Sequence, residues 1–135
     1  MMHLRSRTHL VAMFFAGVLL LLAGAPAAGA LKPPVEAAQL RALLGQEADG
    51  VFVLDVRTRR EWAGGHIPGS VWIPMNDVPA RLADIPAGKK VVVVCASGVR
   101  SAAVARYLDQ VGYPWVAHYP GGVEDWSRRG LPLER

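Results

Sequence analysis

The sequence predicts an α/β fold in which a parallel β-sheet is covered by helices on both faces. Beyond residue 30, short apolar runs that suit buried strands alternate with segments of helical periodicity. One run, Val91-Val92-Val93-Val94, has four consecutive β-branched residues, which favour a strand and disfavour a helix. A strand without polar alternation has no side for solvent, so we expect helices above and below the sheet.

The first elements follow an extended leader, Leu31-Lys32-Pro33-Pro34. Apolar residues recur at helical spacing from Val35 to Leu44, and Gly45 is expected to end that helix. The next element is a continuous apolar run, Val51-Phe52-Val53-Leu54, which ends in Asp55. It is predicted to be a strand buried on both faces.

The middle of the chain alternates between short helices and a short strand. Thr58 has a glutamate three positions after it, which predicts a capped helix that ends at Trp62. A brief strand is expected at 71–73, before a proline. Another short helix is predicted to begin at Asn76 or Asp77 and to be broken by the proline and glycine that follow.

The C-terminal third carries the predicted strand at Val91–Val94 and two more helices. A helix is expected over 101–111 and ends before Gly112, and the last strand is expected over 115–119. The final helix is predicted at 123–129, after a two-glycine turn. Ligands of parallel sheets bind beyond the carboxyl ends of the strands, where Asp55 and Cys95 both lie.

The N-terminal 30 residues have the pattern of a secretory signal peptide. Two arginines and no acid precede an uncharged apolar run over 10–22, and small residues follow it. Ala28-Gly29-Ala30 is the best cleavage site and Ala25-Pro26-Ala27 is the next. We therefore expect a signal peptide at 1–30, a single domain at 31–135, and a periplasmic or secreted protein. The alternative is an uncleaved helix that anchors the protein in the membrane, but the apolar run is shorter than the ~20 residues that span a bilayer.

Charge and cysteine content narrow the classes of partner. Removal of residues 1–30 takes away two basic and no acidic residues, so the formal charge falls from +4 to +2. This small excess suits anionic small molecules and is far from the clustered basic surface of a nucleic-acid-binding protein. The single cysteine, Cys95, cannot form an internal disulfide, and an odd thiol in an exported protein indicates an intermolecular pair or a free reactive group.

The segment 95–101, Cys-Ala-Ser-Gly-Val-Arg-Ser, is here called the Cys95 loop. It lies between a predicted strand and a predicted helix, so several backbone N–H groups and the helix dipole should point inward and stabilise a thiolate. The pKa of Cys95 should fall below the ~8.5 of a free thiol. Gly98 permits a tight turn, and Ser97, Arg100 and Ser101 offer donors to an anion. The alternative is a buried structural cysteine, which the glycine, the arginine and the following helix disfavour.

Taken together, these motifs resemble those of a single-domain rhodanese. The resemblance covers nearly all of the chain after residue 30, in order: Leu54-Asp55-Val56-Arg57, Glu61-Trp62, Gly65-His66-Ile67-Pro68-Gly69-Ser70, Ile73-Pro74, the Cys95 loop, Gly121-Gly122 and Trp126. It implies a five-stranded parallel sheet flanked by helices and a sulfurtransferase that carries sulfur as a persulfide on Cys95. It also implies that Arg100 and the backbone amides of the loop surround the transferred sulfur, the loop residues being Ala96, Ser97, Gly98, Val99 and Ser101.

The spacing of the Cys95 loop disfavours other cysteine chemistries. A protein-tyrosine-phosphatase loop resembles Cys-x5-Arg, whereas four residues separate Cys95 from Arg100. The chain has no second cysteine for a thioredoxin-like motif and no Cys/His cluster for structural zinc. We expect no metal and no organic cofactor.

Three further residues are predicted to support the site. Asp55 and Arg57 lie at the carboxyl end of a strand and could brace the Cys95 loop through an ion pair, and Arg57 could instead contact an anionic substrate. His66 lies in a Gly-His-Ile-Pro-Gly turn, where a residue bonded to backbone is more common than a general base.

The predicted reaction is a double displacement. The Cys95 thiolate attacks the outer sulfur of a small anionic donor such as thiosulfate, and the persulfide passes its sulfur to cyanide or a thiol. We expect no nucleic-acid partner and no stable membrane association after cleavage. The alternative is a redox-sensing or protein-interaction module of the same fold, in which Cys95 forms mixed disulfides.

Overall fold

The computed structural model describes residues 31–135. The predicted signal peptide at 1–30 lies outside the described residues, so its cleavage stays a prediction. Within residues 31–135, no helix is both long enough and apolar enough to cross a membrane.

Four parallel strands form the sheet, in the order β2-β1-β3-β4. Their bounds are β1 Val51–Asp55, β2 Val71–Trp72, β3 Lys90–Val94 and β4 Val116–His118. The family resemblance implied five strands. In the described chain the fifth position, beside β4, is held by a single parallel bridge between Leu31 and Val116. The two prolines that follow Lys32 have no N–H groups with which to extend the pairing.

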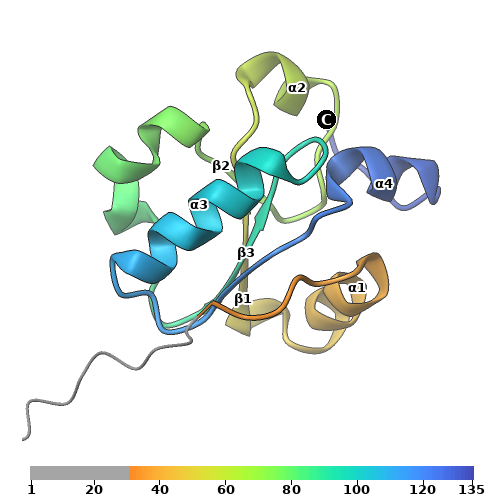
Figure 1. Ribbon diagram of the computed structural model, residues 1–135. Helices are drawn as coiled ribbons and strands as arrows, with labels where there is room; N and C mark the ends of the chain where they lie inside the picture. The colour runs from red at the N-terminus through yellow and green to blue at the C-terminus, as the bar shows by residue number, and fades with distance from the viewer. Residues whose placement is uncertain (1–30) are drawn as a thin grey trace, which may run out of the picture.

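Helices cover both faces of this sheet, as predicted. The bounds are α1 Ala37–Gln46, α2 Arg59–Ala63, α3 Val99–Gln110 and α4 Gly122–Arg128, with short 3-10 segments η1 Ala48–Gly50 and η2 Met75–Asp84. Figure 1 shows α3 and η2 on one side of the sheet and α1 and α4 on the other. Both layers are needed because every apolar side chain of β3 is buried.

The alternation of side chains along β3 divides the core into two layers. Val91 and Val93 pack in one layer, with apolar residues of α3 and η2. Val92 and Val94 pack in the other, with apolar residues of α1 and α4. All four valines are 0% exposed. Successive residues of a strand face opposite sides, so this run builds both halves of the core.

Several predicted boundaries differ from the structure by one or two residues: the first helix begins at Ala37 rather than Val35, and the last covers Gly122–Arg128 rather than 123–129. Gly45 does not end the first helix, because the backbone continues to Gln46 and the N–H of Glu47 still donates to the carbonyl of Leu43. A single glycine costs about 1 kcal/mol within a helix and does not by itself break one. The helix predicted to begin at Ser101 begins two residues earlier, directly after Gly98. The capped helix at Thr58 is confirmed, with both reciprocal bonds of its capping box present.

Candidate active site

The sheet brings Asp55 and the Cys95 loop to the same edge. In the β1–β3 pairing, Asp55 lies opposite Val94, the residue before Cys95. The N–H of Val56 also donates to the carbonyl of Val94, at 3.0 Å. Because both strands are parallel and in register, their carboxyl ends reach the same edge, where parallel sheets bind ligands.

The Cys95 sulfur lies inside its loop, surrounded by donors. The N–H of Gly98 donates to Sγ at 3.1 Å and the N–H of Ser101 at 3.4 Å. Burial of the thiol, which is 1% exposed, would by itself raise its pKa. The N–H groups of Ser101, Ser97 and Gly98, together with the Ser101 hydroxyl, outweigh burial, and the pKa of Cys95 is lowered from its ordinary value. The direction matches the sequence prediction.

The conformation of the loop depends on Gly98. This residue has φ +96° and is the N-cap of α3, so the chain turns directly from the loop into the helix. A Cβ added there would lie 2.3 Å from the carbonyl oxygen of Pro120, on the segment that precedes α4. No other residue fits this position, because both the backbone angle and the space exclude a side chain.

The start of α4 packs on the backbone of the same loop. The N–H of Val123 donates to the carbonyl of Cys95 at 2.9 Å, and the N–H of Glu124 donates to that of Ala96 at 3.1 Å. Gly122 has φ +66°, and a Cβ there would lie 2.3 Å from the carbonyl oxygen of Ala96. Sequence reasoning treated Gly121-Gly122 only as a turn, although a paired glycine before a helix is also a signal of close backbone contact.

Asp55 and Arg57 form a buried ion pair on the α2 side of the loop. Arg57 Nη2 lies 2.8 Å from Asp55 Oδ2, and the two residues are 5% and 0% exposed. The same guanidinium donates to the carbonyls of Glu61 and Gly65. It therefore links the end of β1 to α2 and to the turn that follows α2. These contacts leave little of Arg57 open, and its predicted contact with substrate stays a prediction.

Arg100 lies at the far end of the Cys95 loop, and its guanidinium is bidentate to the carboxylate of Glu61. The two N–O distances are 2.9 and 2.8 Å. The bonds from Arg100 lower the pKa of Glu61 to about 2 and, reciprocally, raise the pKa of Arg100. Glu61 had been predicted only as the partner of Thr58 in the capping box. It performs both functions, because its Oε2 also accepts from the N–H of Thr58 at 2.8 Å.

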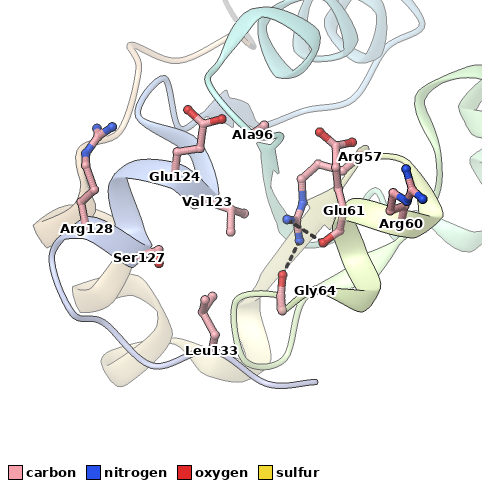
Figure 2. A pocket seen from close by; sticks show the side chains of 11 residues that line it. Arg57, Arg60, Glu61, Gly64, Ala96, Val123, Glu124, Ser127, Arg128 and Leu133 are labelled. Carbon is pink, nitrogen blue, oxygen red and sulfur yellow. Dashed lines mark hydrogen bonds between the residues drawn. The ribbon is translucent and has the colours of Figure 1, made fainter.

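Beside the loop, α2 and α4 form the walls of an open cavity of about 560 Å³. Figure 2 shows its walls: Arg60 and Glu61 come from α2, Glu124 and Arg128 come from α4, and Ala96 of the loop lies between them. Three arginines, the largely buried Arg57 among them, and two glutamates thus line the space next to Cys95. Ser97 and Val99 of the loop, which were also predicted to bind substrate, are exposed to solvent. Their contact with a substrate is untested.

His66 lies in the turn after α2. Its N–H and its carbonyl bond to the backbone of Glu134, and its ring stacks on Trp62 with the ring centroids 3.6 Å apart. Its Nδ1 is buried without a hydrogen-bond partner among the described residues. These contacts are those of a residue that holds the C-terminal segment against α2. Across residues 31–135, no group of three or more His, Cys, Asp or Glu side chains could hold a metal ion.

Comparison with known proteins places this geometry in a family. Residues 36–129 match the rhodanese-like domain. A sulfurtransferase of Allochromatium vinosum is 40% identical over 87 residues, which cover 64% of this chain and 81% of that protein. A thiosulfate sulfurtransferase, GlpE, of Actinobacillus pleuropneumoniae is 30% identical over 88 residues, covering 65% of this chain and 82% of the relative.

Solved structures agree with the sequence relatives. A rhodanese-like domain protein from Staphylococcus aureus superposes with a TM-score of 0.67 at 34% identity, covering 77% of this chain and 100% of that one. A rhodanese-related protein from Thermoplasma volcanium gives a TM-score of 0.67 at 31% identity, over 76% of this chain and 98% of the other. With the matched residues running from α1 to the end of α4, the chain belongs to the rhodanese-like domain family.

Proposed function

We propose that this protein is a sulfurtransferase that carries sulfane sulfur as a persulfide on Cys95. The observation that carries the proposal is the arrangement of N–H donors around Sγ, from Gly98 at 3.1 Å and Ser101 at 3.4 Å. Donors fixed in this way stabilise the negative charge of a thiolate before the reaction and of a persulfide after it. Relatives named as sulfurtransferases support the reaction class.

The first half-reaction loads the enzyme. The Cys95 thiolate attacks the outer sulfur of thiosulfate, an Sγ–S bond forms, and the S–S bond of thiosulfate breaks with its electron pair leaving on sulfite. In the second half-reaction a nucleophile, cyanide or a thiolate, attacks the outer sulfur of the persulfide and releases the Cys95 thiolate. No redox co-reactant is needed, because each step is a displacement at the sulfane sulfur in which one nucleophile replaces another.

The cavity beside the loop is the route we propose for the donor. Arg60 and Arg128 line it and are exposed, so they favour the approach of an anion. Arg128→Ala should raise the KM for thiosulfate by about two- to threefold, an effect that salt should weaken. Arg41→Ala removes the same charge from α1, outside this cavity, and is the matched control. Equal KM values for the two variants would contradict this route.

The intact mass of the purified protein tests the covalent chemistry. Thiosulfate should add one sulfur, about 32 Da, and cyanide should remove it. Cys95→Ser should show neither change, because a serine hydroxyl is not ionised near neutral pH in this loop. Failure of the wild-type protein to gain sulfur would overturn the proposal. A gain equal to one glutathione from oxidised glutathione, without any sulfur gain, would favour the mixed-disulfide module instead.

We also propose export through a cleaved signal peptide at 1–30, on the sequence pattern alone. Protein isolated from cells should begin near Leu31 and should fractionate with soluble periplasmic or secreted proteins. N-terminal sequencing after fractionation tests this. A membrane-bound chain that still begins at Met1 would show that the apolar run is an anchor.

A further inference from the structure

One of the polar neighbours of the Cys95 sulfur, the Ser101 hydroxyl, connects it to a histidine. Sγ lies 3.6 Å from the hydroxyl oxygen of Ser101, and that oxygen lies 3.2 Å from Nδ1 of His118, at the end of β4. Ser101 is 0% exposed, so no solvent competes for its hydroxyl. The three groups form a chain from β3 through α3 to β4.

The number of hydrogens limits how this chain can be arranged. Ser101 has one hydroxyl hydrogen and three candidate acceptors: Sγ, His118 Nδ1 and the carbonyl of Gly98 at 3.0 Å. When Cys95 is a thiol, its S–H donates to the serine oxygen and the hydroxyl hydrogen points to Nδ1 or to Gly98. When Cys95 is a thiolate, the hydroxyl hydrogen is best placed on the sulfur, and an Nδ1–H then donates to the serine oxygen.

The surroundings of His118 favour the neutral form of its ring. Burial against α3 lowers the pKa of His118, and the charge of Arg106, on the same helix, lowers it further. A neutral imidazole has one N–H and one acceptor nitrogen, so it suits both arrangements by a change of tautomer. On the sulfur side of the chain, the charged neighbour is Arg100, whose charge acts on Cys95.

We propose that His118 is a positioning residue of the active site, whose Nδ1 turns the Ser101 hydroxyl toward the Cys95 sulfur when that sulfur is an anion. In this role His118 acts through Ser101, whose hydroxyl oxygen lies between Nδ1 and Sγ. The thiol proton leaves to solvent, and the imidazole proton moves from Nε2 to Nδ1 by exchange. The inference rests on the proposed function only in taking Cys95 as the reactive group.

The rate at which iodoacetamide alkylates Cys95, followed by mass spectrometry across pH, tests this role without requiring sulfur transfer. His118→Phe keeps the size of the ring and removes its nitrogens. We expect it to slow alkylation below the midpoint of the pH profile by about three- to tenfold, the value of one hydrogen bond, and to move the midpoint upward. His118→Asn retains an amide that can donate or accept near Nδ1, so it should recover part of the loss.

A double-mutant cycle separates this role from simple packing. Ser101→Ala should slow alkylation by itself, and adding His118→Phe should cause no further loss, because the histidine would have no hydroxyl to orient. Equal losses from His118→Phe in both backgrounds, or no loss in the wild-type background, would overturn the proposal. Melting curves on the same samples show whether each variant is folded. If His118→Phe does not fold, the same cycle is measured with His118→Asn and Ser101→Ala. Additive losses of the alkylation rate in that cycle would again overturn the proposal.

Discussion

The Cys95 loop is held on its two sides by different chemistry. On the α2 side the contacts are ionic: Glu61 of α2 pairs with Arg100 of the loop, and beside it the buried pair of Asp55 with Arg57 links the end of β1 to the α2 segment. On the α4 side the contacts are between backbone groups. Two N–H groups of α4 donate to loop carbonyls, and Gly122 lets the two backbone segments approach each other closely.

The difference teaches which conditions and substitutions each side tolerates. Ionic contacts weaken when a change of pH neutralises either partner or when salt screens their attraction, and the loss is graded. Backbone contacts at a glycine depend on the absence of a side chain and do not respond to pH or salt. The loop is thus adjustable on the α2 side and rigid on the α4 side, which suits a site that must keep its donors fixed around one sulfur.

The largest expected effect is on the buried ion pair. Asp55→Asn keeps the shape of the side chain and leaves the buried charge of Arg57 without an anionic partner, which should cost about 3–5 kcal/mol of the free energy of unfolding. Urea unfolding measures it. Asp84→Asn is the control, since its pair with Arg81 is exposed and should contribute less than about 1 kcal/mol. Equal losses from the two substitutions would show that burial of the pair is not what matters.

The next effect is on the backbone contact. Gly122→Ala places a methyl group 2.3 Å from the carbonyl oxygen of Ala96 and should cost about 2–3 kcal/mol, with sulfur transfer reduced as the loop shifts. Gly130→Ala is closely matched, because Gly130 has φ +68° against +66° and no atom within 4 Å of an added Cβ. It should cost only the backbone strain, about 1–2 kcal/mol. If the two alanine variants are equally stable and equally active, the close approach of α4 is unimportant.

The smallest expected effect is on the partly exposed pair of Glu61 with Arg100. A double-mutant cycle with Glu61→Gln and Arg100→Ala should give a coupling of about 0.5–1 kcal/mol in low salt, and high salt should reduce it. The Gly122→Ala loss should be the same in both salts. A coupling energy that does not change with salt would mean that the two sides of the loop do not differ in their response to salt.

The dependence of stability on pH is a second test of the pair of Glu61 with Arg100. The pKa of Glu61 is lowered from 4.5 to about 2 by its bonds to Arg100, so the folded state favours the ionised carboxylate. Its contribution should therefore be complete above pH 4.5 and be lost as pH falls through about 2. The difference in stability between wild type and Glu61→Gln, measured by urea unfolding from pH 6 downward, should shrink in acid. A constant difference would mean that the ionised carboxylate of Glu61 adds no stability, either through Arg100 or through the cap at Thr58.

Elements whose signals are local could be predicted from the sequence. The capping box at Thr58 and the β-branched run at Val91–Val94 both depend on neighbours within a few positions, and both are observed. The family resemblance also indicated the place of the sulfur. Contacts between polar groups of different elements could not be predicted, because hydrophobic periodicity reports only which face of an element is buried.

The two contacts that were missed illustrate this limit. Glu61 and Arg100 are 39 positions apart, and the cap at Thr58 already accounted for the glutamate. His118 lies in the last strand, 17 positions from Ser101, and no motif connects them. Each needs the crossover connections of a parallel sheet to bring its two residues together.

The bridge at Leu31 also affects whether strands of other molecules can pair with the edge of the sheet. It lies along β4, an outer strand of the sheet, where the N–H of Lys32 donates to the carbonyl of Val116 and the N–H of Val35 to that of His118. The two residues between them are prolines, which offer no N–H to an approaching strand. The opposite border, β2, has only two residues. Both borders of the sheet are therefore poor templates for strand addition, which protects a sheet rich in valine from edge-to-edge aggregation.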